Sequence, residues 1–167
     1  MIKRVVLGAL AGLVFSSLSM AGGIAEKINV DGAYVRAVPP GLTNSAAFMA
    51  LNNPDEVEHK LVAARSSVAD VVELHTHIND NGIMRMRRID GIDVPPGGTA
   101  KLQPGGHHVM LIGLKKQLMP GDIVDLTLVF EDGSETQQQA PVKKVQAPVM
   151  KCGQGKCGGG GKCGGGK

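Results

Sequence analysis

Histidine and methionine side chains gather in two short segments of this 167-residue chain. Residues 73–86 and 105–110 together contain four of the five histidines and three of the eight methionines. Thioether sulfur is a soft ligand that selects Cu(I), and imidazole binds several transition metals, whereas Ca²⁺ and Mg²⁺ favour oxygen and structural Zn²⁺ favours Cys with His. The chemistry that these residue types predict is therefore the binding of a soft metal ion, with Cu(I) as the best match.

The first of these segments has the pattern of a β-hairpin. Two apolar and β-branched stretches, residues 71–78 and 83–89, flank a polar Asn/Asp/Gly stretch that is typical of a turn. The loop is centred either on residues 80–81 or, as a two-residue Asn-Gly turn, on residues 81–82. Both loops keep side chains of the same parity on one face of the hairpin.

The register of this hairpin decides which potential ligands are neighbours. In the first alternative His75 faces Met86 and His77 faces Met84, with opposed Cβ atoms about 4.5–5.5 Å apart. The two-residue turn shifts the pairing but still leaves all four on the same face. Because the opposite face of residues 71–78 is the more apolar one, we expect the His/Met face to look outward.

The sequence predicts that short β-strands position these residues. Pro-, Gly- and Asn-rich turn signals recur between β-branched stretches, and no window shows a convincing helical period. The pattern predicts an all-β sandwich or barrel with a core of Val, Leu, Ile and Ala, because the chain has no Trp, one Tyr and three Phe. The predicted strands are residues 28–38, 46–51, 60–66, 71–78, 83–89, 99–102, 108–114, 123–130 and 135–142.

Both ends of the chain differ in composition from its centre. Lys3 and Arg4 precede an apolar stretch that is followed by small residues, a pattern that predicts a signal peptide over residues 1–21, cut after Ala21. The mature protein is then expected to be exported to a bacterial periplasm, where it is soluble and has no stable membrane insertion. Residues 22–142 form the predicted domain. From residue 22 to 141 ten Lys and Arg face fifteen acidic residues, a net charge of −5, whereas residues 142–167 carry six Lys and no acid. The few aromatic residues argue against a nucleic-acid partner.

Residues 143–167 form a predicted flexible tail that contains every cysteine of the chain. Cys152, Cys157 and Cys163 are spaced more loosely than the paired C-x2-C units of zinc modules. Two interpretations stay open: the thiols, beside Met150, bind a soft metal, or they form an adventitious disulfide.

The spacing of four of these residues resembles the signature of a known family. His75, Met86, His108 and Met110 reproduce the pattern H-x10-M-x21-H-x-M of the PCu(A)C periplasmic copper chaperones. Further stretches between residues 26 and 142 are similar to family stretches, such as Leu-Gln-Pro-Gly-Gly over residues 102–106. The resemblance implies a cupredoxin-like Greek-key β-sandwich with an exposed Cu(I) site, and it implies that these four residues are the copper ligands.

The resemblance also implies a carrier and not an enzyme. Family members deliver copper to respiratory oxidases, particularly the binuclear copper centre of cytochrome c oxidase, or contribute to copper homeostasis. The expected partner is thus a copper-accepting protein, such as a copper-site subunit or an assembly factor of that oxidase. Carriage of Cu(II) in addition to Cu(I) stays open. His77, Met84 and His107 lie beside the implied ligands and are candidate auxiliary groups.

Three other protein classes fit the sequence less well. An electron-transfer cupredoxin normally uses one Cys with two His, and no cysteine lies within the predicted sandwich. A hydrolase lacks support because neither a Ser nucleophile motif nor a carboxylate pair accompanies the histidines. The main alternative is a non-catalytic secreted β-sandwich, a binding or structural module with incidental metal affinity.

Overall fold

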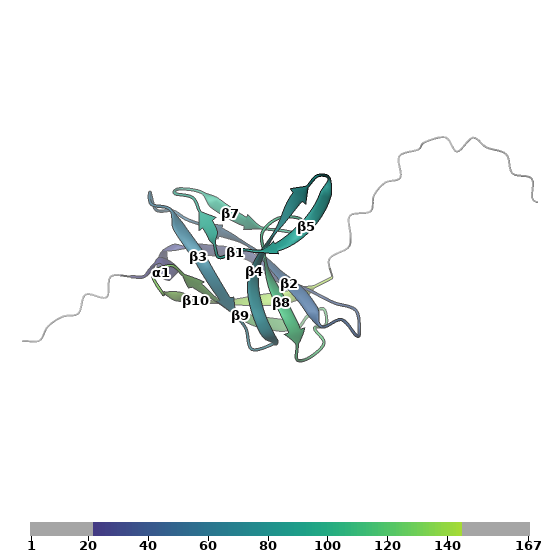
Figure 1. Ribbon diagram of the computed structural model, residues 1–167. Coiled ribbons are helices and arrows are strands. Elements are labelled where there is room, and N and C mark those ends of the chain that lie inside the picture. Colours follow the sequence, from purple (N-terminus) through teal and green to yellow (C-terminus); the bar gives the residue numbers. More distant parts are fainter. Residues whose placement is uncertain (1–21, 145–167) are drawn as a thin grey trace, which may run out of the picture.

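The computed structural model describes residues 22–144 as ten β-strands and one short helix (Figure 1). The elements are α1 (Ile24–Lys27), β1 (Asn29–Arg36), β2 (Asn44–Asn52), β3 (His59–Arg65), β4 (Ala69–Asp80), β5 (Ile83–Arg88), β6 (Ile92–Val94), β7 (Thr99–Leu102), β8 (His108–Leu114), β9 (Ile123–Phe130) and β10 (Glu135–Lys143). All nine predicted strands are present, which confirms the all-β class. Within these residues no helix has the length and apolar character needed to cross a membrane.

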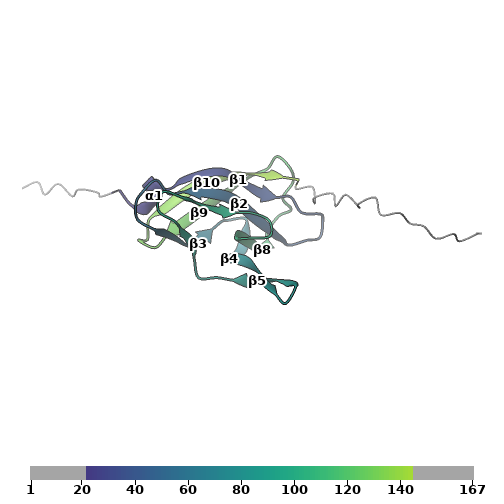
Figure 2. The same ribbon diagram turned by 90° about the horizontal axis from the view of Figure 1, so that it is seen from above.

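The strands pair in the order β5-β4-β8-β2-β1-β10-β9-β3-β6, and β7 pairs with β2. Every pairing is antiparallel except that of β1 with β10, which is parallel. The series of pairings bends back on itself, so that β3 also contacts β4 (Figure 2). Neighbours that are distant in sequence, such as β4 with β8, are expected of a Greek-key connection. The predicted Greek-key sandwich is therefore confirmed.

Aliphatic side chains fill the space between the two layers. The largest completely buried ones include Leu51, Leu61, Leu111 and Leu126, and Phe130 is the one aromatic member of this core cluster. The expected core of Val, Leu, Ile and Ala is confirmed. Burial of this apolar surface is the main favourable term in folding and holds the strands that carry the polar outer face.

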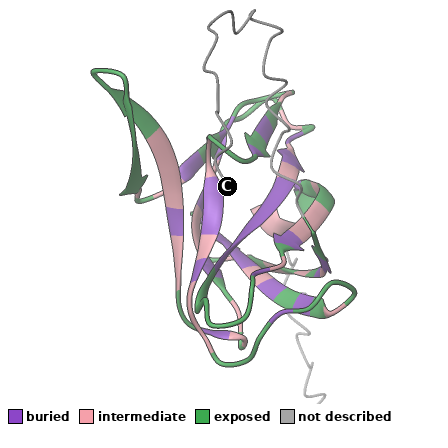
Figure 3. Ribbon diagram, turned by 90° about the vertical axis from the view of Figure 1, so that its right-hand side faces the viewer, coloured by how far each residue is buried: buried purple, intermediate pink, exposed green. Residues whose placement is uncertain are grey.

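The hairpin formed by β4 and β5 projects beyond the body of the sandwich (Figures 1 and 3). All residues of β5 are exposed, and so are the last three residues of β4 before the turn, residues 78–80. Arg85 and Arg87 therefore reach solvent even though they lie on the hairpin face opposite Met86. The free energy of desolvating a charged side chain on that face is small here, because the hydrophobic core does not extend beneath the hairpin.

Candidate metal centre

The turn of this hairpin sets the register of the potential ligands. Asn81 has φ of 53° and Gly82 has φ of 86°, the left-handed backbone of a two-residue hairpin turn. As a result His77 pairs with Met86, whereas His75 pairs further along β5. Of the two registers expected from the sequence, the Asn-Gly turn is the one present. The alternative in which His75 faces Met86 is wrong.

Strand β8 brings the second segment alongside β4. His75 pairs with His108, and Met110, two residues further along β8 and on the same face, pairs with Glu73. Leu74 and Val109, which alternate with them, are buried in the core. The His/Met face therefore looks outward, as the alternation of side chains in the sequence predicts.

A pocket opens on this outer face at the base of the hairpin. It brings together three of the four residues implied by the family signature, Met86, His108 and Met110, and adds His77. His75 lies on the same face but is not among the lining residues. The remaining walls come from Arg36, Ala46, Phe48, Pro104 and Gly105.

His108 forms the most deeply buried part of this site. Its side chain is almost inaccessible, with 2% exposed surface, and its Nδ1 lies 3.0 Å from the carbonyl oxygen of Gly106. Because a carbonyl oxygen only accepts, Nδ1 carries the hydrogen and Nε2 has the lone pair. Nε2 is buried and has no hydrogen-bond partner. Burial lowers the pKa of His108, in opposition to the Gly106 hydrogen bond, and so favours the neutral imidazole that a metal requires.

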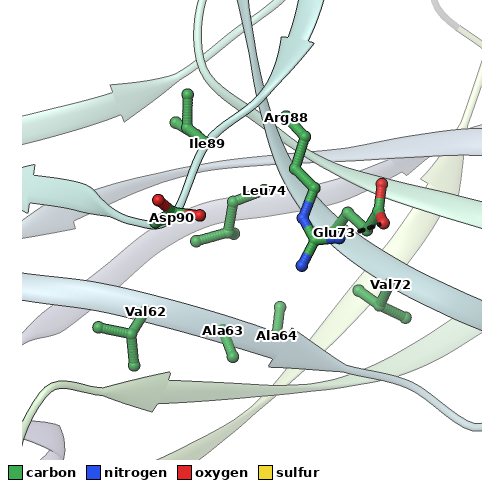
Figure 4. Close-up of a pocket in the computed structure, with 9 residues that line it drawn as sticks. All are labelled: Val62, Ala63, Ala64, Val72, Glu73, Leu74, Arg88, Ile89 and Asp90. Atoms are coloured by element: carbon green, nitrogen blue, oxygen red, sulfur yellow. Dashed lines mark hydrogen bonds and ion pairs between the residues drawn. The ribbon is translucent and has the colours of Figure 1, made fainter.

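Glu73 holds the opposite ring nitrogen of His75. His75 Nε2 donates to Oε2 of Glu73 at 2.8 Å. Arg88 Nη1 donates to Oε1 of the same carboxylate at 3.1 Å (Figure 4). The His75 hydrogen bond is the main reason that the pKa of Glu73 lies below its usual value, with the Arg88 charge adding to it against partial burial. His75 Nδ1 is buried without a partner. His75 thus offers Nδ1 and His108 offers Nε2 as free nitrogens.

Three imidazole rings lie close together around this point. The ring centroid of His108 is 5.2 Å from that of His77 and 5.9 Å from that of His75. His77 Nδ1 is a third buried nitrogen without a partner. Within residues 22–144 no three His, Cys, Asp or Glu side chains are arranged to hold a metal ion by themselves. Met86 and Met110 add two thioether sulfurs, which are soft donors, to the nitrogens at this place.

Of the three candidate auxiliary residues, only His77 lines the pocket. Met84 pairs with Asn79 nearer the turn and has 56% of its surface exposed. His107 bridges to Leu102 and lies outside the pocket lining, although its Nδ1 is also buried without a partner.

The last described residues of the chain lie beside the same face. Arg36, which lines the pocket, pairs with Lys143 of β10. Lys143 Nζ is 5.4 Å from the ring centroid of Tyr34, and this ring packs against Phe48 of the pocket wall. The predicted signal peptide over residues 1–21 and the cysteines of the predicted tail, Cys152, Cys157 and Cys163, lie outside the described residues.

Comparisons with known proteins agree with this architecture. Residues 28–142 match the family described as "Putative lipoprotein LpqE-like". The "Putative lipoprotein Lxx21020" of Leifsonia xyli subsp. xyli is 37% identical over 77% of this chain and 76% of its own length. Among solved structures, a copper-bound PCuAC domain from PmoF2 is 28% identical, with a TM-score of 0.61 over 71% of this chain and 94% of the domain. Apo-DR1885 from Deinococcus radiodurans is 34% identical, with a TM-score of 0.58 over 87% of this chain and 97% of its own.

The sandwich is thus that of a PCuAC-type domain, and the resemblance expected from the sequence is confirmed. The chain belongs to the LpqE-like family, whose match extends from the start of β1 almost to the end of β10.

Proposed function

We propose that this protein is a periplasmic copper chaperone. Exported by residues 1–21, it binds Cu(I) through His75, Met86, His108 and Met110. It passes the ion to a copper-accepting protein, either a copper-site subunit or assembly factor of a respiratory oxidase such as cytochrome c oxidase, or a partner in copper homeostasis. The protein acts as a carrier and not as an enzyme, and copper is its cargo.

The free, buried Nε2 of His108 beside two thioethers is the observation that carries this proposal. A buried polar atom without a hydrogen bond costs free energy, and such an atom in a native fold needs an explanation. A metal ion bound between this nitrogen and the sulfurs of Met86 and Met110 supplies one. Among the similar structures, the PmoF2 domain is described as copper-bound and one DR1885 structure, 40% identical to this chain, as its Cu(I) form.

The proposed ligands suit a cargo that must leave again. Neutral imidazole and thioether need no deprotonation to bind, and they leave no charged group behind when copper departs. Accessibility differs across the set, because His108 is buried whereas Met86 has 43% of its surface exposed. An incoming partner therefore meets Met86 first and can replace it while His108 still holds the ion.

Conservative removal of one thioether tests the ligand assignment. Met86→Leu and Met110→Leu keep the volume and β-structure of each site but remove the sulfur. We expect each to weaken Cu(I) binding by at least about tenfold, or ~1.4 kcal/mol, in anaerobic competition with a chromophoric chelator. Met84→Leu, on the same strand but outside the pocket, is the matched control and should bind as the wild type does. Equal affinity in all four proteins would refute the assignment.

Delivery is tested separately from binding. The Cu(I)-loaded protein is mixed under anaerobic conditions with the metal-free copper-site domain of an oxidase subunit, and metal content is measured after the two are separated. We expect copper to move to the acceptor faster than from a small chelator of equal affinity. If copper transfer from the protein were no faster than transfer from the chelator, the protein would bind copper but the proposed delivery role would be refuted.

A further inference from the structure

We propose that His77 is a copper ligand of this site and exchanges with His75 as the second imidazole. The inference rests on the proposed function and deepens it, because the four-residue signature does not contain His77. Copper stays Cu(I) throughout: the bond to His75 breaks as the bond to His77 forms, and both imidazoles remain neutral.

The position of His77 supports this role directly. His77 lines the pocket with Met86, His108 and Met110, whereas His75 does not. It pairs directly with Met86 across β4 and β5, a relation that places Cβ atoms about 4.5–5.5 Å apart. Its ring lies nearer to that of His108 than the ring of His75 does, and its Nδ1 is buried without a partner.

The two histidines of β4 approach His108 from different directions. His75 pairs with His108 on the β8 side, with its Nε2 fixed by Glu73. His77 lies two residues further along β4, about 6.6 Å toward the turn, where the hairpin leaves the body. We therefore infer two positions for a single Cu(I) ion. One lies near His75 and His108, and the other lies near His77 and Met86.

Exchange, and not simultaneous binding, follows from the arrangement of the donors. Within residues 22–144 no group of three His, Cys, Asp or Glu side chains has the arrangement of a metal site, and His75 lies outside the pocket that His77 and His108 line. Two imidazoles with the two thioethers remain as the donor set at any moment. The change from His75 to His77 moves copper toward the exposed Met86, the side from which a partner can reach it.

A double-substitution experiment tests the exchange. Cu(I) affinity is measured by anaerobic chelator competition for His75→Gln, His77→Gln and the double variant, with His107→Gln as a histidine control outside the pocket. Because one imidazole replaces the other, each single variant should lose less than about tenfold and the double variant more than ~100-fold, a non-additive result. A double variant that binds as tightly as His75→Gln would overturn the inference.

A second measurement uses the unsubstituted protein and does not depend on how the variants fold. Ring ¹⁵N resonances of the histidines are followed by NMR as Cu(I) is added. We expect the ring nitrogens of both His75 and His77 to shift, and those of His107 to stay in place. An unmoved His77 with shifts at His75 and His108 would reject His77 as a ligand but keep the proposed function. An absence of Cu(I) binding would remove both.

Discussion

Neighbouring polar groups decide which ring nitrogen each histidine offers to a metal. Glu73 fixes Nε2 of His75, and the carbonyl of Gly106 fixes Nδ1 of His108. The sequence predicts the residue types and their common face, but these hydrogen bonds depend on side-chain positions that no spacing rule contains. For the same reason, the inclusion of His77 in the pocket lining and the omission of His75 become visible only in the folded chain.

The substitution Glu73→Gln should weaken copper binding without unfolding the protein. Carboxylates that hold a ligating histidine typically contribute 10–100-fold to metal affinity. Because His77 can replace His75 in the proposed exchange, we expect a measurable loss of less than about tenfold here, no larger than that of His75→Gln. The Gln side chain keeps an acceptor oxygen but loses the charge that favours an oriented imidazole. Cu(I) competition measures the change, and the thermal unfolding midpoint checks the fold.

Arg88→Gln provides the control for this charge cluster. Arg88 contacts the same carboxylate, but its side chain is 69% exposed, so its removal should change affinity only slightly. If Arg88→Gln weakened copper binding as much as Glu73→Gln did, the effect would come from general electrostatics and not from the orientation of His75.

Strands long enough to show alternation follow their sequence closely. The predicted and observed bounds agree completely for β7 (Thr99–Leu102), β8 (His108–Leu114) and β9 (Ile123–Phe130). The sequence did not predict β6 (Ile92–Val94), because three residues are too short for a period of two to appear. The sequence did not predict α1 either, because four residues are too few to show a helical period of 3.6.

The hairpin register shows where sequence reasoning left a real choice. Two loops were compatible with the apolar pattern of β4 and β5. The Asn81–Gly82 pair is the strongest short hairpin signal, and the fold uses it. The conformational preference of Asn81 and Gly82 therefore determines the register of the hairpin, which the alternation of apolar residues does not.

Gly82→Ala should destabilise this hairpin. A Cβ at residue 82 meets nothing within 4 Å, so the cost comes from the left-handed backbone alone and amounts to about 1–2 kcal/mol. We expect a lower thermal midpoint and faster amide hydrogen exchange in β5. Gly106→Ala is the matched control, because its Cβ would make ordinary contacts and its φ is not left-handed. Equal destabilisation by both substitutions would contradict the turn argument.

Charged groups at the end of the sandwich remote from the pocket connect α1 to the sheet. Asp55 accepts from Lys27 of α1 at 2.9 Å and interacts with His59 of β3 at 3.0 Å. The His59 hydrogen bond is the largest cause of the lowered pKa of Asp55, and the Lys27 hydrogen bond is the next. These contacts stabilise the folded chain only while the carboxylate is ionised.

Asp55→Asn should therefore reduce stability at neutral pH and lose that effect in acid. Because the folded-state pKa lies below the unfolded value of about 3.9, the Asp55 contribution is complete above that value and disappears as pH falls through the folded-state pKa. Urea unfolding of both proteins between pH 7 and pH 3 measures the difference. The exposed Asp90→Asn is the charge-matched control. A difference that persists unchanged at pH 3 would contradict the assigned cause.

The end at which β10 finishes has a practical consequence for purification. Lys143 pairs with Arg36 at the pocket edge, whereas α1 lies at the other end of β1, roughly 25 Å away along that strand. A polyhistidine affinity tag appended shortly after Lys144 would begin next to the His/Met face and add competing imidazoles there. The same tag placed ahead of α1 begins a whole strand length from that face, so titrations with Cu(I) are best performed on amino-terminally tagged protein.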